Sequence, residues 1–144
     1  MIESDTIKLL RECDAGIKMG VKSINDVIDH VYSKDFKTML NRCKDEHEAL
    51  DSELQELLDK YGDEGKNPNI MAEGMSKMKT GFMLTMKDTD ETIADLMTNG
   101  CNMGVKSLSK YLNKYAAADE KSKDICKRLI KLEDQLATKI RVYL

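Results

Sequence analysis

Long apolar runs, proline and aromatic side chains are scarce in this sequence of 144 residues. The longest apolar runs fall far short of the roughly 20 residues that cross a bilayer, so we expect no membrane-spanning helix and no membrane partner. The start, MIESDTIKLLREC, has no basic segment followed by an apolar one, which predicts no signal peptide and a cytoplasmic location. One proline and 5% aromatic residues, beside 34% charged residues, are typical of long amphipathic helices with aliphatic cores.

Closely spaced cysteine pairs are also missing. None of the cysteines forms a CxxC pair, and each stands on or beside the apolar face of an expected helix: Cys13, Cys43, Cys101 and Cys126. We interpret them as reduced, buried thiols that act as small apolar residues, with a redox or metal role as the alternative.

Charge is unevenly distributed, although the net charge is only −3. Residues 1–65 carry 9 basic and 16 acidic side chains, and residues 105–144 carry 10 basic and 5 acidic ones. No nucleic-acid motif accompanies the basic end, so no nucleic-acid partner is expected. The asymmetry favours attraction between the two halves of the chain, or between two subunits, over binding to an anionic surface.

Apolar residues recur three and four positions apart over four long segments, which predicts four amphipathic helices in one domain spanning residues 1–144. Short turns make the first and second helices, and the third and fourth, antiparallel hairpins. The expected helices are residues 5–32, 36–61, 88–115 and 119–142, the third capped by Asp88.

A Met-rich amphipathic stretch stands between the two expected hairpins, after a loop that contains Gly62, Gly65 and Pro68. We interpret the stretch as a crossover helix that covers one side of the bundle, with an adaptable partner surface as the alternative. Its apolar residues are Met71, Met75, Met78, Phe82 and Met86.

An internal repeat links the two hairpins. The segment GIKMGVKS at residues 16–23 recurs as GCNMGVKS at residues 100–107, in phase with matching apolar stripes. We infer a duplicated helical hairpin and a pseudo-twofold axis. Each copy carries a face of small residues where two backbones could cross closely, with a dimer contact as the alternative. These residues are Gly16, Gly20, Ser23, Gly100, Gly104 and Ser107.

Two related hairpins joined by a crossover of about 25 residues resemble the ferritin-like fold. More narrowly, the chain is similar to an uncharacterised bacterial family of ferritin-like four-helix-bundle proteins, known only as a domain of unknown function. The resemblance covers nearly the whole chain and includes LLRECDAGIKMG (residues 9–20), the amphipathic crossover and the acidic residues 88–95. It implies an all-α, ferritin-like four-helix bundle, and it implies no activity.

A ferritin-like fold raises the question of a di-iron centre. Such a centre takes a glutamate from each of two helices and a Glu-x-x-His motif from each of the other two. The chain has two histidines, and Lys44 and Val27 stand three residues before His47 and His30. We therefore predict no complete di-iron or di-manganese site and no cofactor.

Two polar residues, Asp14 and His47, interrupt otherwise apolar helix faces and are the remaining metal candidates. Folding the first hairpin about its turn separates them by about 9–10 Å along the axis, so they are not expected to share a ligand. We expect a core histidine with a local hydrogen bond, and an aspartate near the end of the bundle that is partly exposed to solvent. The alternative is a single metal ion helped by Glu12, Glu46 or Asp51.

No phosphate-binding loop, nucleophile elbow or Cys–His pair of catalytic geometry is present in the sequence. We predict a non-enzymatic protein-interaction or structural module that acts as a homodimer or with a protein partner. One alternative is a metal-dependent oxidase or storage protein with a degenerate site. The other is a carrier that holds a small apolar ligand at the glycine faces, which requires space between the helices.

Overall fold

The computed structural model describes residues 3–66 and 89–144, which form four α-helices and no strand. The α-helices are α1 (Ser4–Val27), α2 (Lys34–Lys60), α4 (Asp90–Lys114) and α5 (Glu120–Lys139), and short 3-10 helices, Ile28–His30 and Ile140–Tyr143, follow α1 and α5. The all-α prediction is confirmed for this part of the chain. None of its helices is long and apolar enough to cross a membrane. The predicted crossover and Met-rich stretch fall in residues 67–88, outside the described residues.

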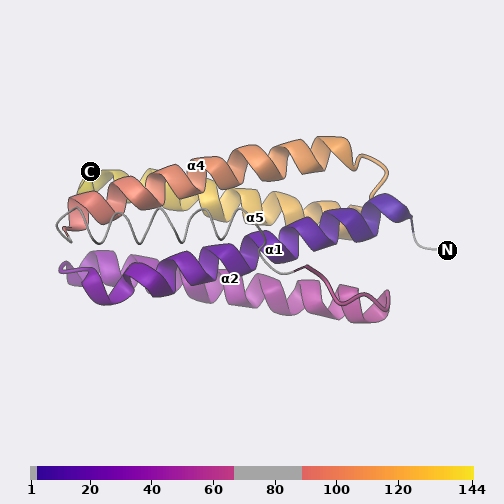
Figure 1. Cartoon of the computed structure of the whole chain (residues 1–144), viewed down its shortest axis with the longest axis horizontal. Coiled ribbons are helices and arrows are strands. Elements are labelled where there is room, and N and C mark those ends of the chain that lie inside the picture. The colour runs from indigo at the N-terminus through magenta and orange to yellow at the C-terminus, as the bar shows by residue number, and fades with distance from the viewer. Residues whose placement is uncertain (1–2, 67–88) are drawn as a thin grey trace.

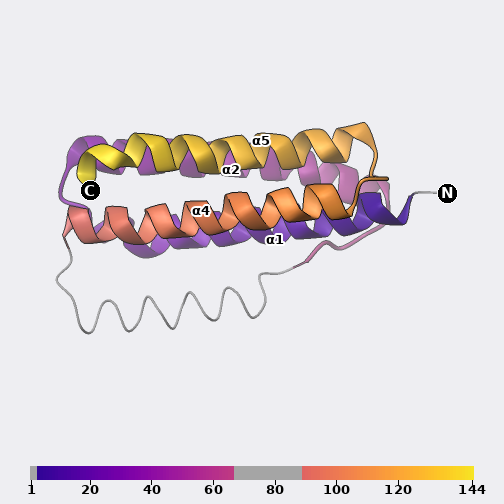
Figure 2. The ribbon, with the colours of Figure 1, turned by 90° about the horizontal axis from the view of Figure 1, so that it is seen from above.

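The described helices pack side by side as a bundle of two antiparallel hairpins, α1 with α2 and α4 with α5 (Figure 1). Figure 2 shows that α1 and α4 lie on one side of the bundle, with α2 and α5 on the other. Asp90, at the start of α4, accepts hydrogen bonds from the backbone of Tyr32 and Ser33 in the α1–α2 turn, at 2.8 and 2.9 Å. At the opposite end, the Tyr61 hydroxyl donates to Asp119 in the α4–α5 turn. α2 therefore ends, and α4 begins, at opposite ends of the bundle.

Short polar side chains begin three of the four helices. Ser33 accepts a hydrogen bond from the Phe36 amide, Thr89 from Thr92 and Asp119 from Ser122. Each satisfies a backbone N–H that has no partner within the first turn of the helix. The prediction that Asp88 caps the third helix was wrong by one residue, because the hydroxyl of Thr89 takes this role.

The apolar core is divided into two clusters along the bundle. One surrounds the α1–α2 turn and contains Phe36, and the other lies toward the opposite end and contains Leu54. Between them, each helix contributes one residue, either a glycine or a titratable side chain, to what we call the central layer: Gly20, His47, Gly104 and Glu133. The buried residues that flank these positions on each helix are Ile17 and Ile24, Cys43 and Leu50, Cys101 and Leu108, and Leu129 and Leu136.

All four cysteines are buried and free of disulfides, as the sequence predicted. Burial raises the pKa of the Cys101 thiol well above its usual range. A buried protonated thiol is a poor nucleophile and a poor metal ligand. Cys101 therefore serves chiefly as a small apolar residue of the core.

Candidate functional site

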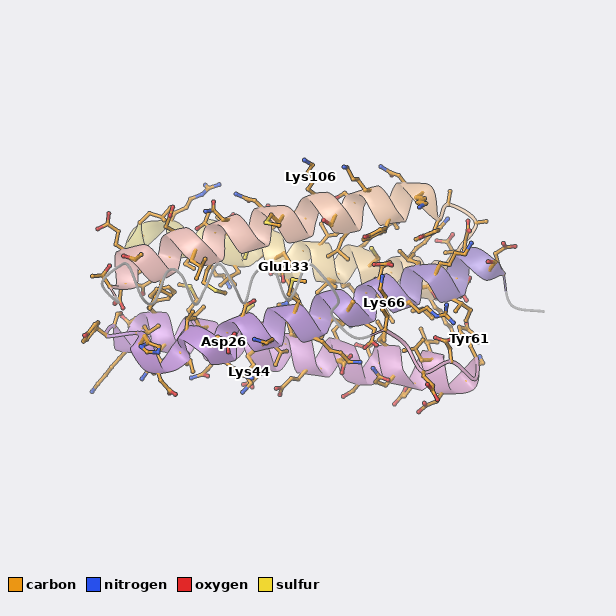
Figure 3. The ribbon with its side chains drawn as sticks, in the orientation of Figure 1. Asp26, Lys44, Tyr61, Lys66, Lys106 and Glu133 are labelled. Carbon is orange, nitrogen blue, oxygen red and sulfur yellow. The ribbon has the colours of Figure 1, made fainter. Side chains whose placement is uncertain are left out.

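The central layer holds a buried ion pair between α2 and α5. The His47 side chain is 1% exposed, and its Nε2 lies 2.7 Å from Oε1 of Glu133, whose side chain is 12% exposed. The other ring nitrogen, Nδ1, lies 2.8 Å from the Cys43 carbonyl oxygen. Because both ring nitrogens face acceptors, the doubly protonated imidazolium fits this position. Figure 3 shows Glu133 near mid-length of the bundle.

The surroundings of His47 favour its charged form. Burial by itself lowers the pKa of His47, but hydrogen bonding with Cys43 and Glu133 and the charge of Glu133 outweigh it, raising this pKa to about 10. The expectation of a locally hydrogen-bonded core histidine is confirmed by the bond to Cys43, one helical turn away. The second partner, Glu133, was not predicted from the sequence.

Two glycines of the small-residue faces make room for this ion pair. A Cβ atom on Gly20 would lie 2.9 Å from both Cδ2 and Nε2 of His47, and one on Gly104 would lie 3.4 Å from Oε2 of Glu133. Gly16 instead faces Leu129 and Leu108, at ordinary contact distances of 3.5 and 3.7 Å. A close crossing of two backbones at these faces stays a prediction, and Gly20 has a role that the sequence did not indicate.

The two central glycines are expected to respond differently to alanine. In Gly20→Ala, overpacking against the His47 ring at about 1–3 kcal/mol exceeds a gain in helix propensity of up to about 1 kcal/mol, so the free energy of unfolding falls. In Gly104→Ala, the new methyl group meets the end of a flexible side chain, so stability is unchanged or rises. Urea denaturation of both variants measures the difference. Equal stability of the two variants would contradict the close contact between Gly20 and the His47 ring.

Asp14 is fully buried, so the expectation of a partly wet aspartate was wrong. Its carboxylate accepts hydrogen bonds from Lys18 Nζ, Gln55 Nε2 and the Lys66 backbone, each at 2.9 Å. The chain after α2 folds back over the aspartate, and a Cβ atom on Gly65 would lie only 2.2 Å from its Oδ2. Asp14 thus anchors the segment that leaves α2.

The residues proposed as metal candidates are not brought together. Asp14 and His47 have separate partners, as expected from their separation along the first hairpin. Glu12 pairs with Lys66, and Gln55 donates hydrogen bonds to both Asp51 and Asp14. Among residues 3–66 and 89–144, no group of three or more His, Cys, Asp or Glu side chains is placed to hold a metal ion.

A groove runs between α1 and α4, and we call it the α1–α4 groove. It encloses a cavity of about 140 Å³, and His47 and Glu133 contribute to its lining. A Glu12–Lys66 ion pair of 2.6 Å lies toward one end, and a Lys22–Asp26 pair of 2.9 Å toward the other. All residues of the two small-residue faces line it: Gly16, Gly20, Ser23, Gly100, Gly104 and Ser107.

Comparison with known proteins gives one match. A domain of unknown function (DUF2383) matches residues 5–114, which include α2, α4 and nearly all of α1. Gly20, His47 and Gly104 fall inside this match, and Glu133 lies beyond it. No curated protein and no solved structure matches the chain. Because the match covers most of the chain, this protein belongs to the DUF2383 family.

Proposed function

We propose that the chain is a ferritin-like four-helix bundle that acts through its surface in the cytoplasm, as a non-enzymatic interaction or structural module. The His47–Glu133 ion pair carries this proposal. Di-metal proteins of ferritin-like fold project carboxylate and imidazole ligands inward from four helices. In this chain, two helices contribute glycine to the central layer, and the other two contribute side chains that bind each other.

A metal ion at His47 would have to displace Glu133 from Nε2 of the ring. Breaking a buried ion pair costs about 3–5 kcal/mol, because the remaining partner is left without a counter-charge. The two central glycines offer no donor in exchange. The four free, buried thiols also suit a reducing compartment.

Element analysis of protein purified without added metal tests the proposal. We expect iron, manganese and zinc well below one ion per chain, with the same content in wild type and in His47→Ala. Isothermal titration with Fe²⁺ and Zn²⁺ extends the test to metal lost during purification. Stoichiometric metal that disappears in His47→Ala would instead favour the degenerate metal-dependent protein.

Self-association is the second measurable part of the proposal. At the surface, an ion pair between Glu53 and Arg128 joins α2 to α5, and Lys106 on α4 points away from the bundle (Figure 3). Such exposed basic residues complement the acidic first hairpin of another copy. Light scattering after size exclusion is expected to give twice the chain mass of 16.3 kDa at low salt, and less at high salt. A monomer at every salt concentration would contradict the dimer.

A small apolar ligand carrier is the second candidate, and the cavity in the α1–α4 groove favours it. This function requires space at the glycine faces, and about 140 Å³ is present there. Native mass spectrometry of freshly purified protein tests for a bound molecule. A co-purified ligand that is lost in Ser107→Phe, but retained in Asn113→Phe outside the groove, would favour the carrier.

A further inference from the structure

Helices α1 and α5 run in the same direction and pack against each other (Figure 1). Near the start of both helices, the Thr6 hydroxyl accepts a hydrogen bond of 2.8 Å from the Asp119 backbone N–H, across 113 positions of the sequence. About four turns further along, a Cβ atom on Gly20 would lie 3.5 Å from Oε1 of Glu133, with the same separation of 113. The two helices therefore keep one register over this length.

This register places Cys13 of α1 opposite Cys126 of α5. The pair also has a separation of 113, and it lies midway between the two contacts that define the register. One turn further, a Cβ atom on Gly16 would lie 3.5 Å from the Leu129 side chain, so a glycine of α1 lets α5 approach beside the cysteines. The two thiols hydrogen-bond to each other, and both residues are 0% exposed. α1 and α5 thus share a buried pair of thiols.

The hydrogen bonds around this pair distinguish the two sulfurs. Cys126 Sγ lies 3.7 Å from the Leu108 carbonyl oxygen, to which its thiol donates, while the Cys13 thiol donates to Cys126. The bond between the sulfurs lowers the pKa of Cys126 and raises the pKa of Cys13 well above its usual range. Because the thiolate is the reactive form of cysteine, Cys126 is the better nucleophile, and Cys13 is the thiol that keeps its proton.

We propose that Cys13 and Cys126 are a site of reversible oxidation, at which hydrogen peroxide joins α1 to α5 through a disulfide bond. The thiolate of Cys126 attacks one peroxide oxygen, the O–O bond breaks, and Cys126 sulfenic acid and hydroxide form. The sulfur of Cys13 then attacks the sulfenic sulfur, which forms the S–S bond and displaces the hydroxyl group. The two thiol protons leave with these oxygens as water. One peroxide is thus reduced to two waters while two thiols are oxidised to one disulfide.

A buried hydroxyl group beside this pair supports a position for the peroxide. Ser122 stands one turn before Cys126 on the same face of α5, and it is 0% exposed. Its Oγ has no hydrogen-bond partner among the residues that the structure describes, although a buried polar group normally has one. Hydrogen peroxide is close to water in size and both donates and accepts hydrogen bonds. A peroxide molecule that reaches Cys126 by local opening of the bundle would satisfy this hydroxyl.

The other two cysteines provide an internal reference. Burial and the neighbouring Glu133 carboxylate raise the pKa of Cys101, which makes it a slowly reacting thiol in the same core. In the unfolded chain, Cys13 and Cys126 would be the least favoured pair, because they are the two cysteines furthest apart in the sequence and closing a longer loop costs more entropy. A disulfide between them therefore reports the packing of α1 on α5.

Peroxide treatment of the full, folded chain tests the proposal. After exposure and removal of the peroxide by catalase, the remaining thiols are alkylated in urea, and disulfides are located by peptide mass spectrometry. We expect one disulfide within the chain, between Cys13 and Cys126, which forms several-fold faster than Cys101 loses its thiol and is reversed by dithiothreitol. The proposal is overturned if all four thiols survive, if other cysteines pair, or if the disulfide joins two chains.

Alanine variants test the order of attack. In Cys13→Ala, oxidation of Cys126 is expected to stop at the sulfenic acid, which dimedone traps. In Cys126→Ala, dimedone labelling of Cys13 is expected to be several-fold lower. Cys101→Ala is the matched control, in which the disulfide forms at the wild-type rate, and circular dichroism checks that each variant is folded. Equal dimedone labelling of the first two variants would overturn the order of attack.

Ser122→Ala tests the position of the peroxide without changing a sulfur. Removing a buried hydroxyl that has no partner is expected to leave stability unchanged or higher, but to slow disulfide formation several-fold. Ser52→Ala, the same change at an exposed position of α2, leaves the rate unchanged. Equal rates in the two variants would overturn the role of Ser122. These outcomes do not depend on a metal at His47 or on dimer formation, so this proposal and the proposed function fail separately.

Discussion

Replacing Glu133 by alanine is expected to lower the free energy of unfolding by about 3–5 kcal/mol at pH 6. The substitution leaves the His47 ring, which is 1% exposed, without the carboxylate at 2.7 Å. A buried cation without a partner must either remain charged at high cost or lose its proton. Urea denaturation followed by circular dichroism measures the loss.

Two control variants distinguish the loss of the ion pair from a general destabilisation of α5. Asp134→Ala, at the exposed neighbouring position, is expected to change stability by less than about 0.5 kcal/mol. The double variant His47→Leu/Glu133→Leu is expected to recover most of the loss, because apolar residues of similar volume often replace a buried pair without cost. A Glu133→Ala variant as stable as Asp134→Ala would refute the assigned pair.

The same ion pair predicts a pH dependence of stability. The pKa of His47 rises from 6.5 to about 10 in the folded chain, so the folded state holds a proton that the unfolded state releases between these values. The stabilisation is complete below pH 6.5 and is lost as the pH rises through 10. The stability difference between wild type and Glu133→Ala should therefore shrink across this window. A difference that grows with pH would contradict a charged His47.

Gly65→Ala is expected to destabilise the chain by about 2–5 kcal/mol, since two effects add at this position. Gly65 has a φ of +80°, where a side chain costs roughly 1–2 kcal/mol. Its Cβ atom would also lie 2.2 Å from the Asp14 carboxylate and 3.0 Å from Leu58, which adds an overpacking cost of about 1–3 kcal/mol. Thermal and urea denaturation measure the combined effect.

Gly62 provides the matched control in the same loop. It also has a positive φ, +68°, but nothing lies within 4 Å of the position of its Cβ atom. Gly62→Ala therefore isolates the backbone cost of roughly 1–2 kcal/mol. If Gly65→Ala costs no more than Gly62→Ala, the loop does not close over Asp14 as described.

Local features of the fold could be predicted from the sequence. Apolar periodicity identified the four described helices, but the turn expected at residues 33–35 lies at residues 31–33, because Ser33 caps α2. Their ends differ by a few residues from prediction, because α1 and α5 finish in 3-10 turns. These features depend on neighbours within one or two helical turns, so the chain carries their signals locally.

The candidate site was only partly predictable. His47 was recognised as a polar residue on an apolar face, but its partner Glu133 stands 86 residues away on another helix. One signal was available: Glu133 interrupts the buried residues of α5 in the same way that His47 interrupts those of α2. To pair His47 with Glu133, one must know that α2 and α5 are neighbours and that the two residues lie at the same position along the bundle axis.

The burial of Asp14 was not predicted for a related reason. Pairing α1 with α2 leaves this aspartate near one end of the hairpin, where water would reach it. Its burial depends on Gly65 and Lys66, which turn back after α2, and the Lys66 backbone N–H donates a hydrogen bond to it. Glycine spacing indicated a loop at this point, but the direction of a loop depends on the surface over which it packs.

The sequence by itself determined the helices, their apolar faces and the repeated small residues, because each of these follows from spacing along one chain segment. Only the tertiary structure decided what the small residues and the polar interruptions do. Side-by-side packing places Gly20 against the His47 ring and Glu133 against its Nε2. A buried charge depends on partners brought from distant segments, and that pairing exists only once the helices are assembled.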